Sequence, residues 1–416
     1  MDSKKTIIFK VSTFPRVSET FVIHQAITAI ELGYQVFILV HKKNDFKKSL
    51  HEELLNKYHL EDKIIQENII IPKNKFFRLL KVVFLFLKYC YRFSDIYNFY
   101  KYQPSNNKSI SWIFYWVFYN NLDSKDTIFH VQFGNHKYPL DILKSKCNFK
   151  SKLIVSFHGH DAFFPMYGYV PNNNYYGLLF QGTDFIIANT NYLAEKLIDL
   201  GCPENKIKII PVAVNTDYFR PSEKVRIDKT DLKLINVGRL DPIKGQKYLI
   251  EIVKKLEKQG VNVQLNIIGE GEERENLEAL ILNYGLVNKV ILLGAKSQDE
   301  IKYHLQNSDL YLFTAVPVEG GRRETQGLAT LEAQACGLPV LAYDSGGIKY
   351  TINDGFSGFV FDECEIDKIV DKIIYLNKNR NVLEKMRLNC ISFIENEFSN
   401  NVLNKKWEVL YKYLLS

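Results

Sequence analysis

The sequence predicts an α/β protein of two doubly wound domains, each with a parallel sheet covered by helices on both faces. The first observation is length, because 416 residues exceed what one ordinary hydrophobic core supports. The second is the strand pattern, which consists of short, continuously apolar runs separated by helical stretches, as in buried parallel sheets. The third is repetition, because one such series ends at Asn189, another begins at Leu232, and the expected boundary between them follows Ile209-Ile210-Pro211. Two series predict two domains.

The expected strands fall into these two series. The first comprises Thr6–Val11, Gln35–Val40, Thr127–Val131, Lys152–Phe157 and Asp184–Asn189. The second comprises Leu232–Val237, Val261–Ile268, Lys289–Leu293, Asp309–Phe313 and Pro339–Tyr343. Between them, the polar stretch Asn215–Leu232 contains Pro221 and mixed charges and indicates a linker. The last run, Asn401–Leu415, is expected to form a helix with an apolar face made by Val402, Trp407, Leu410, Tyr411 and Leu414.

Composition and charge limit the classes of function. Hydrophobic residues make up 46% and charged residues 24% of the chain, the balance of a folded protein. The net charge of +7 and pI near 8.8 suit anionic small molecules or an anionic membrane surface. No zinc-finger spacing or RNA-binding aromatic motif indicates a nucleic-acid partner. The six cysteines form no Cys-X-X-Cys pair, and the N-terminus shows no secretory hydrophobic region, so we expect a reduced, cytoplasmic protein without a zinc site.

One region departs from the alternating pattern. Residues 72–122 are rich in Phe, Tyr, Trp and Lys, and their apolar stretch is too short and too charged to span a bilayer. On a helical projection, one face carries the basic residues Arg78, Lys81, Lys88 and Arg92. Aromatic residues and leucines lie on the opposite face. Residues 73–92 could therefore lie on the inner face of an anionic cell membrane. Alternatively, the helix packs its apolar side on the domain core and leaves its basic side in solvent.

The segment from residue 320 to residue 342 gives the strongest indication of a ligand site. Glu324 and Glu332 would lie about 80° apart on one continuous helix, so we place Glu324 in the loop or cap and Glu332 on the helix that follows. The amides that would open this helix, and could bind a diphosphate, are those of Gln326, Gly327, Leu328 and Ala329. The downstream carboxylate can accept hydrogen bonds from ribose hydroxyls, and the upstream one can reach hydroxyls of a transferred sugar. The alternative is a solvated helical face.

A second indication follows the strand that ends near Gly238. Arg239 and Lys244 flank a strand-to-helix turn, where two cations can neutralise a diphosphate leaving group. The alternative is a loop with exposed basic residues, which are mostly solvated.

Two weaker indications lie in the first half of the chain. His158, His160 and Asp161 follow an expected strand, at the end where open α/β sheets bind ligands. No further residues complete a metal ligand set with them. In the first strand-to-helix turn, Ser18 could cap the helix and Glu19 would occupy its first turn. This turn lacks the Gly-X-Gly-X-X-Gly pattern of dinucleotide-binding proteins, so a plain helix cap is the alternative.

Taken in order and with their spacing, these segments resemble a family 4 glycosyltransferase of the GT-B superfamily. The resemblance extends over nearly the whole chain and includes FPRVSETFV, HVQFG, SFHGHD, VGRLDPIKG, ETQGLATLEAQACGLPVLA and NDGFSGFVF. The opening FPRVSETF is similar to the branch that builds exopolysaccharide, capsule and lipopolysaccharide. Departures from the usual pattern include Ala213, Asn215 and Ile348-Lys349, as well as the unusually basic Gly320-Gly321-Arg322-Arg323.

The resemblance implies two Rossmann-like domains: an acceptor-side domain over residues 1–212 and a donor-binding domain over residues 213–398. It also implies that residues 399–416 form a helix that crosses back to the first domain. By motif match, Arg239 and Lys244 would hold the donor diphosphate, Glu332 the ribose and Glu324 the transferred sugar. His158 would approach that sugar from the other domain, and neither a cofactor nor a metal ion would be required. Ser18, Glu19 and Asp161 would belong to the acceptor side.

These implications lead to a retaining, metal-independent hexosyltransferase as the expected activity. Its donor would be a nucleotide-diphosphate sugar, and its acceptor a glycan or a lipid-linked oligosaccharide. A nucleotide-sugar epimerase of the same architecture and a non-catalytic nucleotide-sugar-binding protein remain alternatives. A dehydrogenase is disfavoured because the glycine-rich fingerprint is missing.

Overall fold

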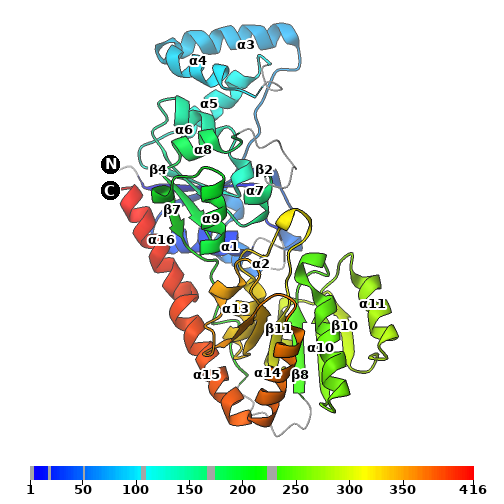
Figure 1. Cartoon of the computed structure of the whole chain (residues 1–416). Helices are drawn as coiled ribbons and strands as arrows, with labels where there is room; N and C mark the ends of the chain where they lie inside the picture. The colour runs from blue at the N-terminus through cyan, green and yellow to red at the C-terminus, as the bar shows by residue number, and fades with distance from the viewer. Residues whose placement is uncertain (1–3, 17–19, 50–51, 105–108, 166–173, 223–231) are drawn as a thin grey trace. The chain divides into compact units, whose positions relative to one another are not determined.

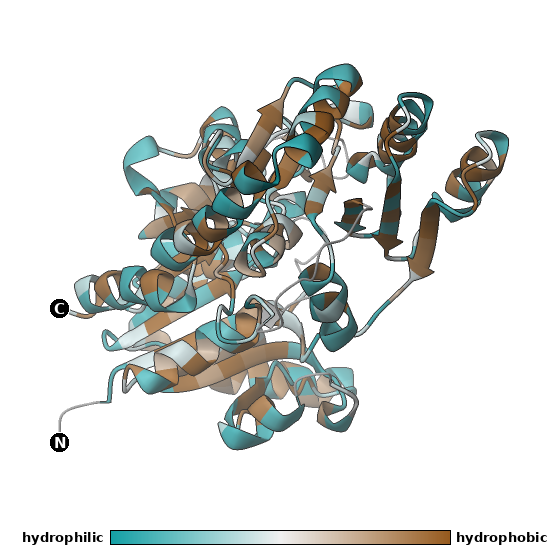
Figure 2. Ribbon diagram, turned by 90° about the horizontal axis from the view of Figure 1, so that it is seen from below, coloured by the Kyte–Doolittle hydropathy of each residue, from teal (hydrophilic) through white to brown (hydrophobic). Residues whose placement is uncertain are grey.

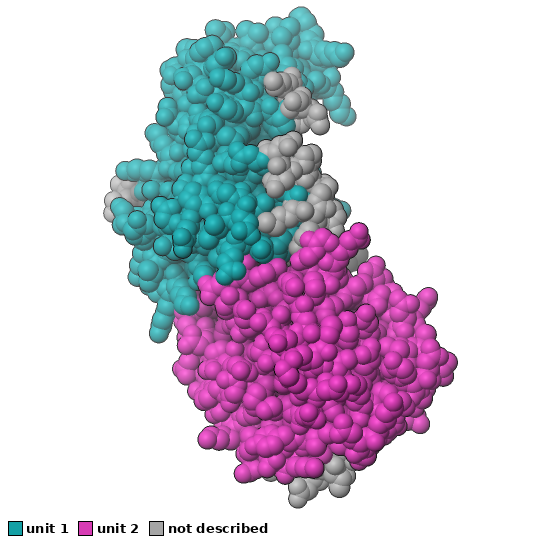
Figure 3. Space-filling model, in the orientation of Figure 1, with its two compact units in different colours: residues 1–188, 194–210, 404–416 teal, residues 189–193, 211–403 magenta. Residues whose placement is uncertain are grey.

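The computed structural model describes residues 4–16, 20–49, 52–104, 109–165, 174–222 and 232–416. The chain divides into two compact units, coloured separately in Figure 3. Unit 1 comprises residues 1–188, 194–210 and 404–416, and unit 2 comprises residues 189–193 and 211–403. The chain thus passes into unit 2 after residue 210, whereas the first domain was expected to end at residue 212. Each unit contains a parallel sheet, which confirms the predicted fold class.

The sheet of unit 1 has the order β3-β2-β1-β4-β5-β6-β7, and every pair in it is parallel (Figure 1). Its strands are β1 (Thr6–Phe14), β2 (Gln35–Lys43), β3 (Ile64–Gln66), β4 (Thr127–Gln132), β5 (Lys152–Ser156), β6 (Phe185–Ala188) and β7 (Ile207–Ile209). The α-helices that follow these strands are α1 (Thr20–Glu31), α2 (Glu52–Lys57), α3 (Lys75–Lys88), α4 (Phe93–Lys101), α5 (Trp112–Leu122), α6 (Leu140–Lys146), α7 (His160–Phe163), α8 (Gly177–Gly182) and α9 (Asn191–Asp199). Parallel pairing brings the carboxyl ends of β4 and β5 to one edge, so the loops after these strands share that edge.

The sheet of unit 2 has the order β10-β9-β8-β11-β12-β13 and is also parallel. Its strands are β8 (Leu232–Val237), β9 (Val263–Ile268), β10 (Val290–Gly294), β11 (Leu310–Phe313), β12 (Val340–Tyr343) and β13 (Gly358–Phe361). The α-helices are α10 (Gln246–Lys258), α11 (Arg274–Asn283), α12 (Gln298–Gln306), α13 (Leu328–Ala335), α14 (Ile366–Lys378), α15 (Arg380–Glu397) and α16 (Asn400–Leu414). The order reverses between β8 and β11, and ligands in such sheets bind beyond the strand ends at this point.

Alternation along the strands of unit 2 explains their continuous apolar character. In β11, Leu310 and Leu312 face one core while Tyr311 and Phe313 face another. Side chains of α10 and α14 complete the first core, and side chains of α13 and α15 complete the second. Both faces of the sheet are therefore covered, and the buried strands appear as hydrophobic bands in Figure 2.

Helix α16 belongs to both units, because its residues up to Leu403 lie in unit 2 and the rest lie in unit 1. Its apolar face packs in the core of unit 1 with strands β1 and β2, through Trp407, Leu410, Tyr411 and Leu414. The expected apolar face is therefore confirmed at these four residues. Val402 is only partly buried, and its neighbour Leu403 is fully buried instead. The chain crosses back to the first unit, as predicted.

Among the described residues, three strands were not predicted from the sequence, namely β3, β7 and β13. They are the edge strands β3 and β7 of one sheet and the edge strand β13 of the other. Strands β3 and β7 span three residues each and contain no buried residue. Edge strands are covered incompletely, so they lack the continuous apolar run that marks a central strand. The expected linker also begins inside unit 2, because Phe219 packs in its core.

Helix α3 differs from the prediction in how its basic residues are arranged. It ends at Lys88, so Arg92 lies in the following 3-10 turn, where its guanidinium donates to Asp95 and to the carbonyl of Asn148. Arg78 donates to the carbonyls of Pro72 and Lys73. The prediction of one solvent-facing basic stripe is therefore wrong, because two of its four cations are held by the chain itself.

The apolar side of α3 is exposed, which also contradicts a core-facing helix. Within this helix only Val82 and Leu85 are buried, whereas Phe76 is 64%, Phe84 61% and Leu87 70% exposed. Figure 1 shows α3 and α4 side by side at the end of unit 1, beyond α5. Among the described residues no helix has the length and apolar character needed to cross a bilayer.

Candidate functional site

The turn after β8 holds Lys244 in a fixed place. Asp241 caps the 3-10 turn Pro242–Lys244 by accepting the amide hydrogen of Ile243 over 3.1 Å. Gly245 then adopts a left-handed φ of 62°, and a Cβ atom there would lie 2.0 Å from the carbonyl oxygen of Thr314. Because only glycine fits, the chain approaches β11 closely and enters α10 directly after Lys244.

Lys244 forms an ion pair with Glu324. The Lys244 Nζ atom lies 2.5 Å from Glu324 Oε2, and the two side chains are only 17% and 18% exposed. The ammonium also lies 5.3 Å from the centre of the Phe313 ring. The structure thus brings together two predicted site residues that are far apart in the sequence.

The pKa of Glu324 is lower than usual despite its burial. Burial alone would raise this pKa, but the Lys244 ammonium and the amides of Thr325 and Gln326 outweigh it. The carboxyl group is therefore ionised at neutral pH and acts as a hydrogen-bond acceptor.

Helix α13 begins directly after this pair, as predicted. Its N-cap is Gly327, at a left-handed φ of 76°, and no side chain caps the helix. Gln326 turns away, since its amide group bonds to the backbone N–H and C=O of Val212 at 3.0 and 2.9 Å. The opening turn at Leu328 and Ala329 thus offers amide groups and a positive dipole end beside the Lys244–Glu324 pair. Such a helix end binds phosphate groups.

Glu332 lies inside α13, and Glu324 lies before it, which is the arrangement expected from their spacing. Burial raises the pKa of Glu332 to about 7, because the loss of solvation disfavours the charged carboxylate. The folded chain therefore holds this proton more tightly than the unfolded chain. The stability due to protonation is present below the ordinary pKa of 4.5 and is lost as the pH rises to about 7.

Glu332→Gln removes this titration, so we expect the variant to be more stable than the wild type at pH 8 and about equal to it at pH 5. Thermal unfolding at the two pH values measures the difference. Glu275→Gln, on the exposed side of α11, serves as the control and should show no such pH-dependent gain. A Glu332→Gln melting temperature that follows the wild type at both pH values would contradict the burial argument.

Arg239 and two further arginines lie close in sequence to Lys244 and Glu324 and contact carboxylates. Arg239 is 75% exposed, and its nearest described anion is Asp241, 3.7 Å away. Arg322 lies 3.8 Å from the other oxygen of Asp241, and Arg323 pairs with Glu363. The sequence marked Arg322 and Arg323 only as an unusually basic run beside Glu324. In the structure each of them is near a carboxylate that follows a strand, Asp241 after β8 and Glu363 after β13.

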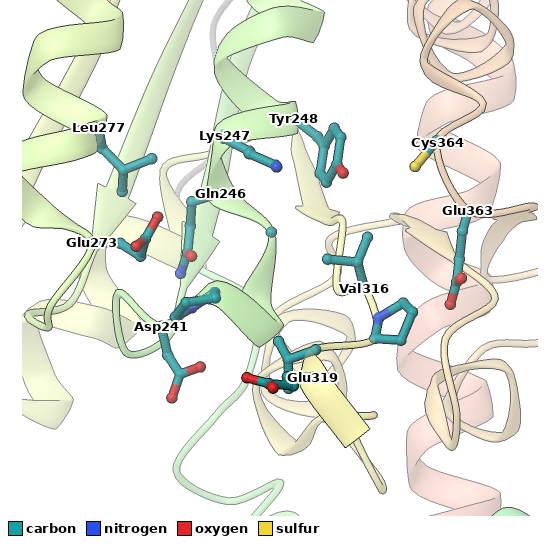
Figure 4. A pocket seen from close by; sticks show the side chains of 14 residues that line it. Asp241, Gln246, Lys247, Tyr248, Glu273, Leu277, Val316, Glu319, Glu363 and Cys364 are labelled. Carbon is teal, nitrogen blue, oxygen red and sulfur yellow. The ribbon is translucent and has the colours of Figure 1, made fainter. Parts of the chain in front are cut away.

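A pocket of about 430 Å³ lies at the same end of the unit 2 sheet (Figure 4). Its acidic lining residues are Asp241, Glu273, Glu319 and Glu363, against one lysine, Lys247. Neither Lys244 nor either predicted glutamate lines it. Four carboxylates would repel a diphosphate, so the cationic side of the turn, at Lys244 and the start of α13, is the better anion site.

In unit 1, His158 follows β5 and lies between two aromatic rings. Its ring centre is 4.4 Å from that of Phe21 and 4.7 Å from that of Phe133. Its Nε2 atom lies 2.9 Å from the side-chain oxygen of Gln132. Burial lowers the pKa of His158 to about 3, so the imidazole is neutral at physiological pH.

Asp161 is used by the backbone around it. Its carboxylate accepts N–H groups from Gly134, His158 and Gly159 at 2.7 to 3.0 Å, and the residue is 2% exposed. Burial raises its pKa to about 6, although these amides lower it. The carboxylate therefore holds the loop that presents His158. The other acceptor-side candidates, Ser18 and Glu19, lie outside the described residues.

In a comparison with known proteins, both halves of the chain match glycosyltransferase families. Residues 18–218 match the family described as "Glycosyltransferase Family 4", and residues 219–393 match "Glycosyl transferases group 1". The chain is 27% identical to the putative colanic acid biosynthesis glycosyltransferase WcaL of Escherichia coli K12, over 98% of this chain and 99% of that protein. It is 25% identical to the amylovoran biosynthesis glycosyltransferase AmsK of Erwinia amylovora, over 95% and 96% of the two chains.

Solved structures share the fold at lower identity. Anabaena Alr3699/HepE in complex with UDP superposes with a TM-score of 0.71 at 17% identity, covering 98% of this chain and 100% of that one. The glycosyltransferase of Rickettsia africae superposes with a TM-score of 0.67 at 20% identity, covering 99% of both chains. Both comparisons support the same two-domain architecture along the whole chain.

Proposed function

The chain belongs to the glycosyltransferases that join a Family 4 domain to a group 1 domain in the GT-B fold, and we propose that it transfers a hexosyl group from a nucleotide-diphosphate sugar. The acceptor is a glycan or a lipid-linked oligosaccharide, and the anomeric configuration is retained. Relatives are named for colanic acid and amylovoran biosynthesis, which supports a role in making a cell-surface polysaccharide, in capsule or in lipopolysaccharide. We place the reaction in the cytoplasm, at the inner face of the membrane.

The observation that supports a nucleotide-sugar donor most directly is the Lys244–Glu324 pair beside the uncapped start of α13. A cation and a helix N-terminus bind the diphosphate. Glu324, ionised and within reach of the same ammonium, accepts hydrogen bonds from the hydroxyls of the transferred sugar. Glu332, in the second turn of α13, accepts the ribose hydroxyls. HepE, the similar structure, was solved with UDP, with UDP and glucose, and with UDP-glucose.

In the proposed reaction, the bond between the anomeric carbon and the diphosphate oxygen breaks, and a bond from the acceptor hydroxyl oxygen forms on the same face. The leaving phosphate accepts the proton of that hydroxyl, so no side chain acts as a covalent nucleophile. Lys244, the α13 amides and Arg239 stabilise the negative charge on the leaving group. Because cations of the chain serve this purpose, the reaction needs no metal ion. His158, neutral at physiological pH, is proposed to contact the transferred sugar.

We further propose that α3 rests on an anionic membrane. At 100° per residue, the exposed apolar residues from Phe76 to Leu87 occupy an arc of about 160°, and Lys81 and Lys88 lie along one border of it. The chain has no Asp or Glu from residue 68 to residue 94, so the region is uniformly basic. An apolar face bordered by lysines is typical of helices that lie in the membrane interface. The acceptor suited to this position is a lipid-linked one.

The donor is tested with a panel of nucleotide-diphosphate sugars, incubated with the protein with and without a lipid-linked oligosaccharide acceptor. We expect one donor to release its nucleotide rapidly when the acceptor is present and slowly when it is absent. The new linkage should have the donor's anomeric configuration, read by NMR, and EDTA should leave turnover unchanged. A donor converted to another sugar that stays attached to its nucleotide would instead identify an epimerase. Tight binding without turnover of any donor would identify a binding protein.

A further inference from the structure

A chain of buried hydrogen bonds connects helix α16 to His158 inside unit 1. The Tyr411 hydroxyl lies 3.0 Å from His130 Nδ1, and His130 Nε2 lies 3.1 Å from the amide nitrogen of Gln132. The amide oxygen of Gln132 lies 2.9 Å from His158 Nε2. Gln132 also donates to Gln25 Oε1 over 2.7 Å. These contacts connect α1, β4, the loop after β5 and α16 through the side chains of Gln132 and His130.

The hydrogen-bonding groups of these side chains determine which atom is the donor in the contact between His158 and Gln132. The Gln132 oxygen can only accept, so His158 Nε2 carries the proton and His158 Nδ1 the lone pair. The Gln132 amide then donates one hydrogen to Gln25, and its nitrogen lies 3.1 Å from His130 Nε2. His130 Nε2 also lies 2.8 Å from the Ser156 hydroxyl, which can donate or accept, so His130 has a partner for either tautomer. The Gln132 oxygen therefore determines the tautomer of His158.

Gln132 has no access to a substrate. Gln132 and His130 are both 0% exposed, and they lie on the same face of β4, two residues apart. His158, in contrast, is only partly buried, at the carboxyl end of the neighbouring strand. Gln132 can therefore act on the reaction only through its neighbours, and among them His158 is the proposed contact of the sugar.

We propose that Gln132 is a positioning residue, which fixes His158 as the Nε2–H tautomer and holds its ring between Phe21 and Phe133. The inference rests on the proposed function in that His158 contacts the transferred sugar. The rings on either side restrict tilting of the imidazole, and the hydrogen bond to Gln132 restricts its rotation.

The test uses Gln132→Met, which keeps the side-chain volume and removes both hydrogen-bonding groups. The control is Gln103→Met, since Gln103 is also a buried glutamine of unit 1 but bonds to Tyr138 and Phe99. In ¹⁵N-histidine-labelled protein, His158 should give the Nε2–H pattern in the wild type and in Gln103→Met, and a mixture of tautomers in Gln132→Met. The His158 signals are assigned from a His158→Asn variant.

Kinetics provide the second measurement. We expect Gln132→Met to lower kcat about 10- to 100-fold, as small misplacements of reacting groups do, with little change in KM for the donor. Gln132→Glu keeps an acceptor for His158 Nε2–H, so it should recover the Nε2–H pattern and part of the lost kcat. It should also raise the pKa of His158, which a histidine titration followed by NMR detects.

The outcomes separate the inference from the proposed function. A wild-type His158 spectrum in Gln132→Met would overturn the positioning role, whatever the activity. A changed His158 spectrum with unchanged kcat would support the positioning of His158 by Gln132 and overturn the contact of His158 with the sugar. A fall in kcat equal in Gln132→Met and Gln103→Met would reduce the effect to packing and also overturn the positioning role.

Discussion

Replacing Lys244 with alanine is expected to reduce kcat about 100- to 1,000-fold, the range found when one preorganised charge-stabilising group is removed from an active site. The Lys244 ammonium is held by Glu324, which lies three residues before Gly327, the N-cap of α13. Charge develops on the leaving diphosphate only as the sugar bond breaks. The loss should therefore appear in kcat more than in KM for the donor.

The same substitution also affects stability, and a second variant separates the two effects. In Lys244→Ala the mostly buried Glu324 carboxylate loses its ion partner, so the melting temperature should fall. In the Lys244→Ala, Glu324→Ala double variant no charge is left unpaired, so much of the stability should return. The kcat should not return with it. Activity that recovered together with stability would show that Lys244 has only a structural role.

Lys247→Ala is the matched control. Lys247 lies three residues further along, is exposed, and makes a cation–π contact with Tyr248. Its removal takes away the same charge from the same end of α10, so a general electrostatic effect on donor binding would appear in both variants. We expect Lys247→Ala to keep kcat within about threefold of the wild type, the range of a distant, screened charge. An equal loss in the two alanine variants would contradict a specific role for Lys244.

The central part of each sheet could be predicted because it is buried on both faces. Strands such as β8 and β11 read as continuous apolar runs, and helices alternate with them. The edge strands β3 and β7 could not, since they have no buried residue to mark them, whereas the edge strand β10 was predicted. The alternation and the order of motifs were therefore enough for the fold class but not for every strand.

The site divides in the same way. The placement of Glu324 before a helix and Glu332 within it follows from their spacing alone. The contact of Glu324 with Lys244 does not, because it joins residues that are 80 positions apart and depends on how β11 and the Gly245 turn meet. The hydrogen-bond network through Gln132 could not be predicted from the sequence either, because it joins four separate segments. Local spacing predicts local geometry, whereas partners across the sheet require the packed structure.

Helix α3 shows the limit most clearly. Its periodicity predicts an amphipathic helix, but periodicity does not tell which side the rest of the chain covers. In the structure the covered side is the one with Arg78, Val82 and Leu85, and the exposed side is apolar. The membrane hypothesis therefore changes its basis from a basic stripe to an apolar face bordered by lysines.

Replacing Leu80, Phe84 and Leu87 with serine is expected to weaken binding to anionic vesicles at least about 100-fold. Each of these side chains is more than half exposed, so each could transfer its apolar surface into the membrane interface. Burial of one such side chain is worth about 1.5–3 kcal/mol, and partial burial of three exceeds the 2.7 kcal/mol that a 100-fold change requires. Sedimentation with vesicles of phosphatidylcholine and phosphatidylglycerol measures the bound fraction.

The control replaces three equally exposed apolar residues of unit 2, namely Leu282, Val287 and Leu388, with serine. It should bind vesicles like the wild type, and both variants should keep their thermal stability, because surface substitutions change it little. With a soluble acceptor the α3 variant should also keep wild-type kcat, since none of its substitutions touches the donor residues.

The lysines that border the exposed face are tested separately, by changing Lys81 and Lys88 to glutamine. Each lysine near an anionic surface contributes about 1 kcal/mol, so the preference for anionic over neutral vesicles should fall about 30-fold for the pair. Glutamine at Arg78 or Arg92 is the wrong test, because these side chains bond to the chain itself. If the triple serine variant sediments with anionic vesicles as the wild type does, α3 is not the membrane contact. The exposed apolar face would then need a protein partner, and serine substitution would abolish that complex instead.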